Sequence, residues 1–195
     1  MHRLLVFSDL DGSLLDHDTY DFAPALPAID AIKARGGLLI LASSKTASEM
    51  RPLHQALDLG AAPMIVENGA ACVPASGVTN KDADYRAIRQ VLQTLHAPFR
   101  GFGDMSAAEV QRLTGLSREE AQRAKARQFS EPGLWQGDAR QRATFLAALA
   151  RRGISARQGG RFLTLSFGAT KACQMETVKQ RHAPCVTIAL GDAPN

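Results

Sequence analysis

The stretch VFSDLDGSLL, residues 6–15, joins a strand-like run to two carboxylates. An apolar run from Leu4 to Phe7 leads into Asp9 and Asp11, which are separated by a single residue. A nearly continuous apolar run is typical of a strand that is buried on both faces of a parallel sheet. Buried carboxylates are costly unless another group compensates their charge, so this stretch indicates both a fold class and a functional site.

The first part of the chain alternates predicted strands and helices. Residues 38–42 (LLILA) and 63–66 (PMIV) are predicted strands, and residues 24–35 and 47–57 are predicted helices. This order predicts an α/β fold with a Rossmann-like parallel sheet and right-handed crossovers. The same pattern returns at the end of the chain, with a helix over residues 171–181 and a further buried strand expected at residues 185–190 (CVTIAL).

Between residues 80 and 167 the pattern changes to amphipathic helices with short strands. Helices are expected at residues 82–95, 106–114, 117–128 and 138–152, and strands at residues 99–103 and 161–167. We therefore predict two domains. Residues 1–79 plus 168–195 form a discontinuous core domain, and residues 80–167 form an inserted α/β domain.

The composition of the 195 residues narrows the class of protein. Hydrophobic residues make up 45% and charged residues 22%, which is typical of a globular protein. The sequence contains no apolar stretch of about 18 residues, so it predicts no membrane span. The three cysteines have no metal-ligand spacing, which favours reduced thiols in a cytoplasmic protein. The net charge of +4 suits a small anionic partner, whereas scattered basic residues and few aromatic ones argue against nucleic acid.

Each of the four predicted parallel strands ends in polar residues. These are DLDG at residues 9–12, SSK at 43–45, ENG at 67–69 and GD at 191–192. Ligands of open parallel sheets bind beyond the carboxyl ends of the strands, so we expect these residues to converge. A divalent cation would relieve the repulsion among Asp9, Asp11 and Asp192, and ligands that are all oxygen point to Mg²⁺.

Several motifs resemble those of a known enzyme family. Residues 9–15 (DLDGSLL) resemble the first motif of the haloacid dehalogenase-like phosphatases, and Ser43, Lys171 and residues 191–195 (GDAPN) resemble the second, third and fourth. Four further stretches are similar to the mannosyl-3-phosphoglycerate phosphatases: SSKT at 43–46, ENG at 67–69, ARQFSEP at 126–132 and GGRF at 159–162. That family carries an α/β cap between the second and third motifs.

The resemblance implies a Mg²⁺-dependent phosphatase that hydrolyses mannosyl-3-phosphoglycerate to mannosylglycerate through an aspartyl-phosphate. It implies that Asp9 is the nucleophile, that Asp11 is the general acid and base, and that Ser43 and Lys171 contact the transferring phosphoryl group. Mg²⁺ would be held by Asp9, by Asp11 through its carbonyl, and by Asp192. The implied substrate-binding residues are Gly12, Ser44, Lys45, Glu67, Asn68, Arg127, Glu131, Arg161 and Asn195. The partner would be a small phosphorylated sugar acid, and the protein a monomer or weak homodimer.

Other interpretations of these residues stay open. The two aspartates could be turn or cap residues, Ser43 could cap a helix, Glu67–Gly69 could be a simple tight turn, and Arg127 and Arg161 could be ordinary surface arginines. A phosphatase for another sugar phosphate, such as glucosyl-3-phosphoglycerate or a hexose phosphate, is an alternative. So are a phosphohexomutase and an inactive ligand-binding remnant. The family's fourth motif continues with an acid after the asparagine, so we expect the C-terminal part of the core to be missing after Asn195.

Overall fold

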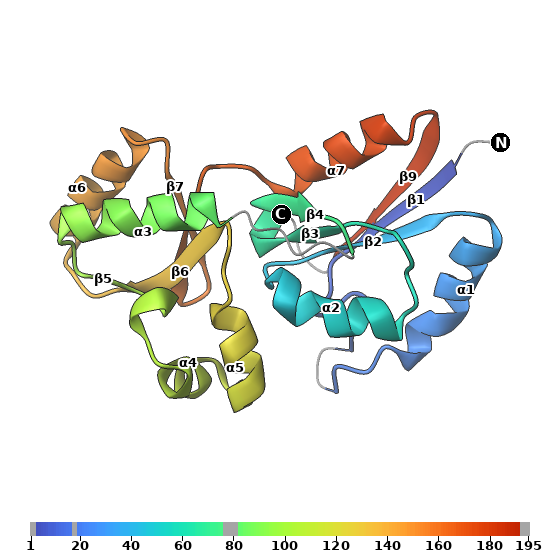
Figure 1. The fold of residues 1–195 in the computed structure, drawn as a ribbon, viewed down its shortest axis with the longest axis horizontal. Coiled ribbons are helices and arrows are strands. Elements are labelled where there is room, and N and C mark those ends of the chain that lie inside the picture. The colour runs from blue at the N-terminus through green and yellow to red at the C-terminus, as the bar shows by residue number, and fades with distance from the viewer. Residues whose placement is uncertain (1–2, 17–18, 76–81, 192–195) are drawn as a thin grey trace. The chain divides into compact units, whose positions relative to one another are not determined.

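The computed structural model describes residues 3–16, 19–75 and 82–191, and the chain divides into two compact units (Figure 1). Unit 1 consists of Met1–Val78 and Thr170–Asn195, and unit 2 consists of Thr79–Ala169. Each unit has its own sheet and its own hydrophobic core, so the two are described separately.

Unit 1 contains a five-stranded sheet with the order β4-β3-β2-β1-β9. Strands β1 (Arg3–Ser8), β2 (Leu38–Ala42), β3 (Met64–Val66) and β9 (Cys185–Leu190) are parallel to one another. Strand β4 (Ala71–Val73) pairs antiparallel with β3. The predicted α/β fold with a parallel sheet is confirmed, whereas β4, with only three residues, has no pattern that reveals it in the sequence.

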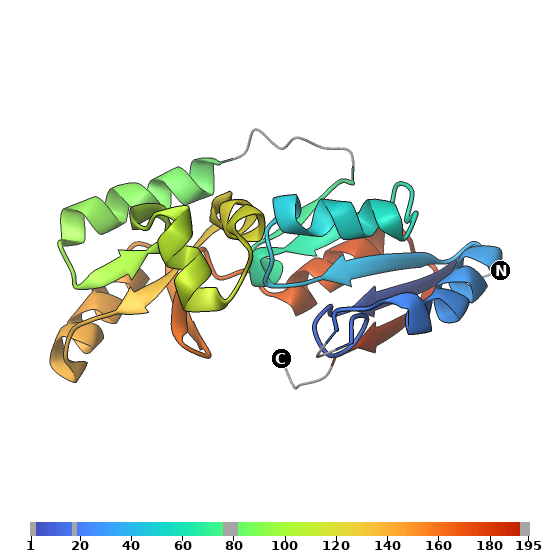
Figure 2. The same cartoon turned by 90° about the horizontal axis from the view of Figure 1, so that it is seen from below.

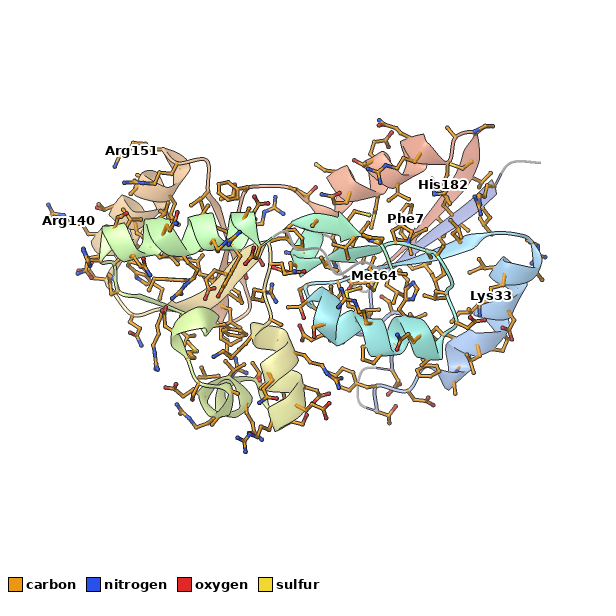
Figure 3. All side chains as sticks on the ribbon, in the orientation of Figure 1. Phe7, Lys33, Met64, Arg140, Arg151 and His182 are labelled. Carbon is orange, nitrogen blue, oxygen red and sulfur yellow. The ribbon has the colours of Figure 1, made fainter. Side chains whose placement is uncertain are left out.

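Helices cover both faces of this sheet (Figures 1 and 2). Helices α1 (Leu26–Ala34), which follows the 3-10 turn η1 (Ala23–Ala25), and α2 (Ala47–Ala56) lie on one face, and α7 (Lys171–Arg181) lies on the other. The core on the α7 side contains fully or almost fully buried residues from three strands and the helix: Leu5, Phe7, Ile40, Ala42, Ile65 and Val178. Phe7 and Met64 are labelled within this sheet in Figure 3. Apolar residues from alternating strands and helices therefore form the core that the sequence pattern predicts.

The strand at residues 185–190 is present, but the prediction that it is buried is wrong. Val186, Ile188 and Leu190 are 54%, 45% and 50% exposed. Strand β9 pairs with β1 on one side only and stands at the end of the described sheet. An apolar sequence does not reveal how many neighbours a strand has, so edge and central strands look alike before the tertiary structure is known.

Unit 2 contains a four-stranded antiparallel sheet with the order β5-β6-β8-β7. Its strands are β5 (Phe99–Gly101), β6 (Ser130–Trp135), β7 (Ser155–Gly159) and β8 (Phe162–Ser166). The 3-10 turn η3 (Phe102–Asp104) directly follows β5, at the end of the strand predicted over residues 99–103.

Two helix pairs pack with this sheet around separate clusters. Helices α3 (Ala83–Leu95) and α6 (Ala139–Ala150) contribute Ile88, Phe145 and Leu149 to the larger cluster. Helices α4 (Ala107–Thr114) and α5 (Arg118–Lys125) contribute the smaller cluster around Val110, Ala121 and Ala124. The serines that precede α4 and α5, Ser106 and Ser117, form capping boxes, and α5 ends at Lys125, three residues before the predicted end. No helix in the described segments is long and apolar enough to cross a membrane.

Strands β6 and β7 are not predicted from the sequence. The β6 sequence, SEPGLW, contains Pro132 and Gly133, which are both unfavourable in strands. Strand β5 pairs only with residues 133–135, so Pro132 lies where β6 has β8 as its single partner. A proline is tolerated in such a position because one side of the strand needs no hydrogen bond from it.

Candidate active site

The loops that follow β1, β2 and β3 meet the first turn of α7 in unit 1. They contribute Asp9 and Asp11 after β1, Ser43 and Lys45 after β2, and residues 67–69 after β3. Hydrogen bonds connect each of these loops to another, as described below. The predicted convergence of these three loops at the carboxyl ends of parallel strands therefore takes place in the structure.

Asp9 is held by contacts at both carboxylate oxygens. The amide of Leu10 donates to Oδ1 over 2.8 Å, and Nζ of Lys171 donates to Oδ2 over 2.5 Å. The side chain of Asp9 is 18% exposed and that of Lys171 is 10% exposed, so water screens this ion pair only partly. The backbone amide of Asp9 also donates to the Leu190 carbonyl, which ties the end of β1 to β9. A carboxylate held this firmly, with some solvent access, is suited to nucleophilic attack.

The residues after Asp9 form a tight turn around one carbonyl. The amides of Ser13, Leu14 and Leu15 all donate to the carbonyl of Leu10, a residue that is 1% exposed. Gly12 has a φ of 71°, in the left-handed region that glycine adopts most readily. The sequence DLDGSLL therefore anchors an apolar leucine between two aspartates that remain partly accessible.

Ser43 is buried, with 1% exposure, and its backbone bridges β2 to the loop after β3. Its amide donates to the Ile65 carbonyl, its carbonyl accepts from the Asn68 amide, and its hydroxyl accepts from the Lys45 amide over 3.2 Å. The structure excludes Ser43 as the cap of α2, because Thr46 occupies that position and forms a capping box with Glu49. Ser44, the residue between Ser43 and Lys45, is exposed.

The loop after β3 has an unusual backbone. Glu67, Asn68 and Gly69 have φ values of 51°, 60° and 87°, so three successive residues occupy the left-handed region. The carboxyl-bearing residue Glu67 is 2% exposed, and its amide donates to the carbonyl of Lys45. The segment is the tight turn η2 (Glu67–Gly69). It also lies among the other candidate residues, so its interpretation as a simple turn and its interpretation as part of the site are compatible.

Gly69 allows α7 to approach this turn. A Cβ at Gly69 would lie 2.0 Å from the backbone nitrogen of Lys171 and 2.1 Å from the carbonyl carbon of Thr170. Thr170 caps α7 by accepting from the Cys173 amide. Because Lys171 is the first residue of α7, this contact brings its side chain to Asp9.

Asp11 forms a second lysine–aspartate pair. Nζ of Lys45 donates to Oδ1 of Asp11 over 2.7 Å and to Oδ2 over 2.6 Å. The aromatic ring of Tyr20 lies 5.9 Å from the same ammonium, which is within the range of a cation–π contact. The sequence predicts a substrate-binding role for Lys45 and gives no role to Tyr20. An aromatic residue shortly after the first motif is the one signal that could have indicated it.

The predicted substrate-binding residues Arg127, Glu131 and Arg161 all belong to unit 2. Arg127 donates to the hydroxyl of Ser130 over 2.7 Å. Arg161 is exposed and donates to the carbonyl of Leu113. Both arginines that the sequence predicts to bind substrate therefore belong to unit 2, and Arg127 is less exposed than Arg161.

Glu131 is 0% exposed and belongs to a buried polar cluster that the sequence does not predict. Its Oε1 accepts from the Gly103 amide over 2.8 Å and lies 3.6 Å from Arg89, and it is hydrogen-bonded to Tyr85. Arg89 also donates to both carboxylate oxygens of Asp104. Tyr85 and Arg89 are four residues apart on α3, so their shared face is the signal that could have revealed the cluster.

Burial and close contacts shift the pKa values of three side chains in this cluster. Removal from water raises the pKa of Glu131, although the Gly103 amide, Tyr85 and Arg89 oppose the shift. Burial and the neighbouring Glu131 raise the pKa of Tyr85, and the hydrogen bond from Arg89 lowers the pKa of Asp104. Gly101 is required here because a Cβ would lie 2.0 Å from Oε1 of Glu131.

Two predicted site residues, Asp192 and Asn195, lie outside the described residues. Among the described ranges, no group of three or more His, Cys, Asp or Glu side chains is arranged to hold a metal ion. Asp9 and the backbone carbonyl of Asp11 supply only oxygen donors, which fits a hard cation such as Mg²⁺.

Residues 6–132 match the model of the haloacid dehalogenase-like hydrolases. Because this match covers more than half of the chain, the protein belongs to that family.

Solved structures with the same fold include a haloacid dehalogenase-like hydrolase from Bacteroides thetaiotaomicron, with 18% identity and a TM-score of 0.63 over 97% of this chain and 81% of that chain. A phosphatase of the haloalkanoate superfamily from the same organism has 18% identity and a TM-score of 0.64, over 97% and 76%. A subclass IIB sugar phosphatase has 15% identity and a TM-score of 0.61, over 95% and 79%. At these identities the likeness concerns the fold.

Substituting Gly69 tests whether the close approach of α7 positions the site. We expect Gly69→Ala to lower the free energy of unfolding by about 3 kcal/mol, because it adds both a clash and left-handed strain. Gly60→Ala is the matched control, since Gly60 has a φ of 59° and no atom within 4 Å of its Cβ position. It should lose only about 1 kcal/mol. Equal losses in urea unfolding of the two variants would contradict the close-packing role.

The raised pKa of Glu131 predicts a dependence of stability on pH. A carboxyl that binds its proton more tightly in the folded state contributes stability below its ordinary pKa of 4.5, and this contribution is lost as pH rises through the raised value. Glu131→Gln removes the titrating carboxyl and with it this contribution to stability. We therefore expect the melting temperature of the natural chain to fall relative to that of the variant over the pH interval that begins at 4.5 and extends upward. Melting curves that stay parallel over this interval would refute the prediction.

Proposed function

We propose that this hydrolase is a phosphomonoesterase that transfers the phosphoryl group of its substrate to Asp9. The observation that carries the proposal is the 2.5 Å contact between Asp9 and Lys171, residues that are 162 positions apart in the sequence. A lysine that contacts a partly accessible carboxylate at the end of a parallel strand can neutralise an anion that approaches this carboxylate. Phosphoryl transfer needs this combination of a nucleophile and positive charge.

The proposed reaction has two steps. In the first, an oxygen of Asp9 forms a bond to phosphorus, the ester P–O bond breaks, and Asp11 gives a proton to the leaving oxygen. In the second, Asp11 takes a proton from water, whose oxygen attacks the phosphorus and releases phosphate from Asp9. Lys171 stabilises the negative charge of the transferring group, and Ser43 donates a hydrogen bond to one of its oxygens.

We propose that Mg²⁺ is held by Asp9, the carbonyl of Asp11 and Asp192. The first two supply oxygen donors from the same turn, as described above. The cation would supply charge neutralisation between the nucleophile and the phosphate dianion.

Unit 2 is proposed to act as the cap that selects the substrate, with the core and cap boundaries predicted from the sequence. Residues 79–169 contain 15 basic residues (Lys and Arg) and 8 acidic residues (Asp and Glu), which gives unit 2 a net charge of +7. The rest of the chain contains 8 basic and 11 acidic residues, which gives unit 1 a net charge of −3. Such a basic unit favours an anionic substrate. Arg127 and Arg161 are the proposed contacts for a substrate carboxylate.

The proposed substrate is mannosyl-3-phosphoglycerate, a sugar joined to a phosphorylated acid. The motif resemblance at residues 43–46, 67–69, 126–132 and 159–162 supports this choice. One solved structure with the same fold is a sugar phosphatase, which supports the broader class. Glucosyl-3-phosphoglycerate and hexose phosphates are the alternative substrates, and they belong to the same broad class of sugar phosphates.

The test measures phosphate release with Mg²⁺ from these compounds and from 3-phosphoglycerate and 4-nitrophenyl phosphate. We expect the highest kcat/KM for mannosyl-3-phosphoglycerate, and a loss of at least about 1,000-fold for Asp9→Asn on every compound. Asp30→Asn, on the exposed surface of α1, is the matched control and should retain activity. Turnover by Asp9→Asn at the natural rate, or no release from any compound by the natural chain, would overturn the proposal.

A further inference from the structure

Lys45 connects the three candidate loops of unit 1 through separate groups. Its amide donates to the hydroxyl of Ser43 in its own loop, and its carbonyl accepts from the amide of Glu67 in the loop after β3 over 2.9 Å. Its ammonium reaches both carboxylate oxygens of Asp11 in the loop after β1. The backbone amide and carbonyl of Lys45 are therefore both hydrogen-bonded, in addition to the contact of its ammonium with Asp11.

Asp11 needs such a partner because its own surroundings constrain it weakly. Its side chain is 45% exposed, and it lies in a turn next to Gly12. A short acidic side chain in an exposed turn can adopt several rotamers, and each wrong rotamer moves the carboxylate away from a reacting atom. Two hydrogen bonds from one ammonium restrict both oxygens at once.

The ammonium of Lys45 is itself restricted. Its side chain is 25% exposed, and the ring of Tyr20 lies beside it at 5.9 Å from the ring centre. A lysine whose backbone is hydrogen-bonded and whose ammonium is bordered by an aromatic ring has fewer alternative positions than a free surface lysine. This arrangement favours a lysine that orients a neighbour over one that extends toward a ligand.

We propose that Lys45 is a positioning residue that orients the carboxylate of Asp11, and that it is not a substrate-binding residue. This inference rests on the proposed function, in which Asp11 protonates the leaving oxygen. Each carboxylate oxygen has two lone pairs, so one contact from Lys45 per oxygen leaves a position for the transferred proton. Lys45 acts on the reaction only through the placement of Asp11.

The proposal makes a prediction that depends on the leaving group. In the first step, Asp9 bonds to phosphorus, and the electron pair of the broken ester bond goes to the leaving oxygen, which takes the proton of Asp11. An alkoxide leaving group needs this proton, whereas nitrophenolate is a weak base and leaves without it. Losing the orientation of Asp11 should therefore slow the transfer from an alkyl phosphate and spare the transfer from an aryl phosphate.

The experiment compares Lys45→Met with the natural chain on 3-phosphoglycerate and 4-nitrophenyl phosphate. The ratio kcat/KM is measured because it reports only the steps up to formation of the phosphorylated Asp9. We expect a loss of about 30-fold to 100-fold for 3-phosphoglycerate and less than about 3-fold for 4-nitrophenyl phosphate. Lys45→Arg, which keeps the charge and the donors, should recover part of the loss. Lys179→Met removes an exposed lysine of α7 and should change neither value.

A double variant separates positioning from a direct role. In the Asp11→Asn background, Lys45→Met should cause no further loss on 3-phosphoglycerate, because Lys45 acts only through Asp11. Equal losses of Lys45→Met on both substrates, or a further loss in the Asp11→Asn background, would show direct binding or a general structural effect and would overturn the proposal. Circular dichroism of every variant establishes that the chain is folded.

A measurement without turnover tests the contact itself. The ammonium resonance of Lys45, observed by ¹⁵N NMR, should shift in Asp11→Asn and stay unchanged in Asp30→Asn. An unchanged resonance in Asp11→Asn would overturn the positioning role even in an active enzyme. If the natural chain releases no phosphate from any compound, the proposed function fails, and the NMR result still decides whether Lys45 holds Asp11.

Discussion

The candidate site depends on the absence of a side chain at Gly69. The backbone nitrogen of Lys171 lies only 2.0 Å from the position that a Cβ at Gly69 would occupy. The turn after β3 and the first turn of α7 therefore share a space that only glycine leaves open. Because Lys171 begins α7, this contact determines where its ammonium meets Asp9.

The two aspartates of DLDG have different environments although they are one residue apart. Asp9 and Lys171 have side chains that are 18% and 10% exposed, whereas Asp11 and Lys45 have side chains that are 45% and 25% exposed. Charges that are partly removed from water interact more strongly than exposed ones. The more enclosed pair suits a nucleophile that must face a phosphate anion, and the more open pair suits a group that exchanges protons with a leaving group and with water.

The two units differ in net charge as well as in the type of sheet that they contain. The net charge of +4 for the whole chain is the sum of +7 for unit 2 and −3 for unit 1. A single value for the chain conceals this difference, since opposite contributions cancel. In the proposed function, unit 1 contributes the acidic catalytic groups and unit 2 contributes positive charge for an anionic substrate.

The sequence by itself determined the parallel sheet of unit 1, the helices of both units and the loops that carry the polar residues. These features depend on local periodicity and on the residues at element ends, such as the run before Asp9 and the capping serines of α4 and α5. Strand β6 escaped prediction because Pro132 and Gly133 obscure its pattern, and its place in the sheet depends on its partners. The tertiary structure alone decided that β9 is exposed, that Lys45 pairs with Asp11, and that Glu131 is buried with Tyr85 and Arg89. Each of these facts depends on whether distant segments contact one another, and local sequence patterns contain no information about which distant side chain will fill a given space.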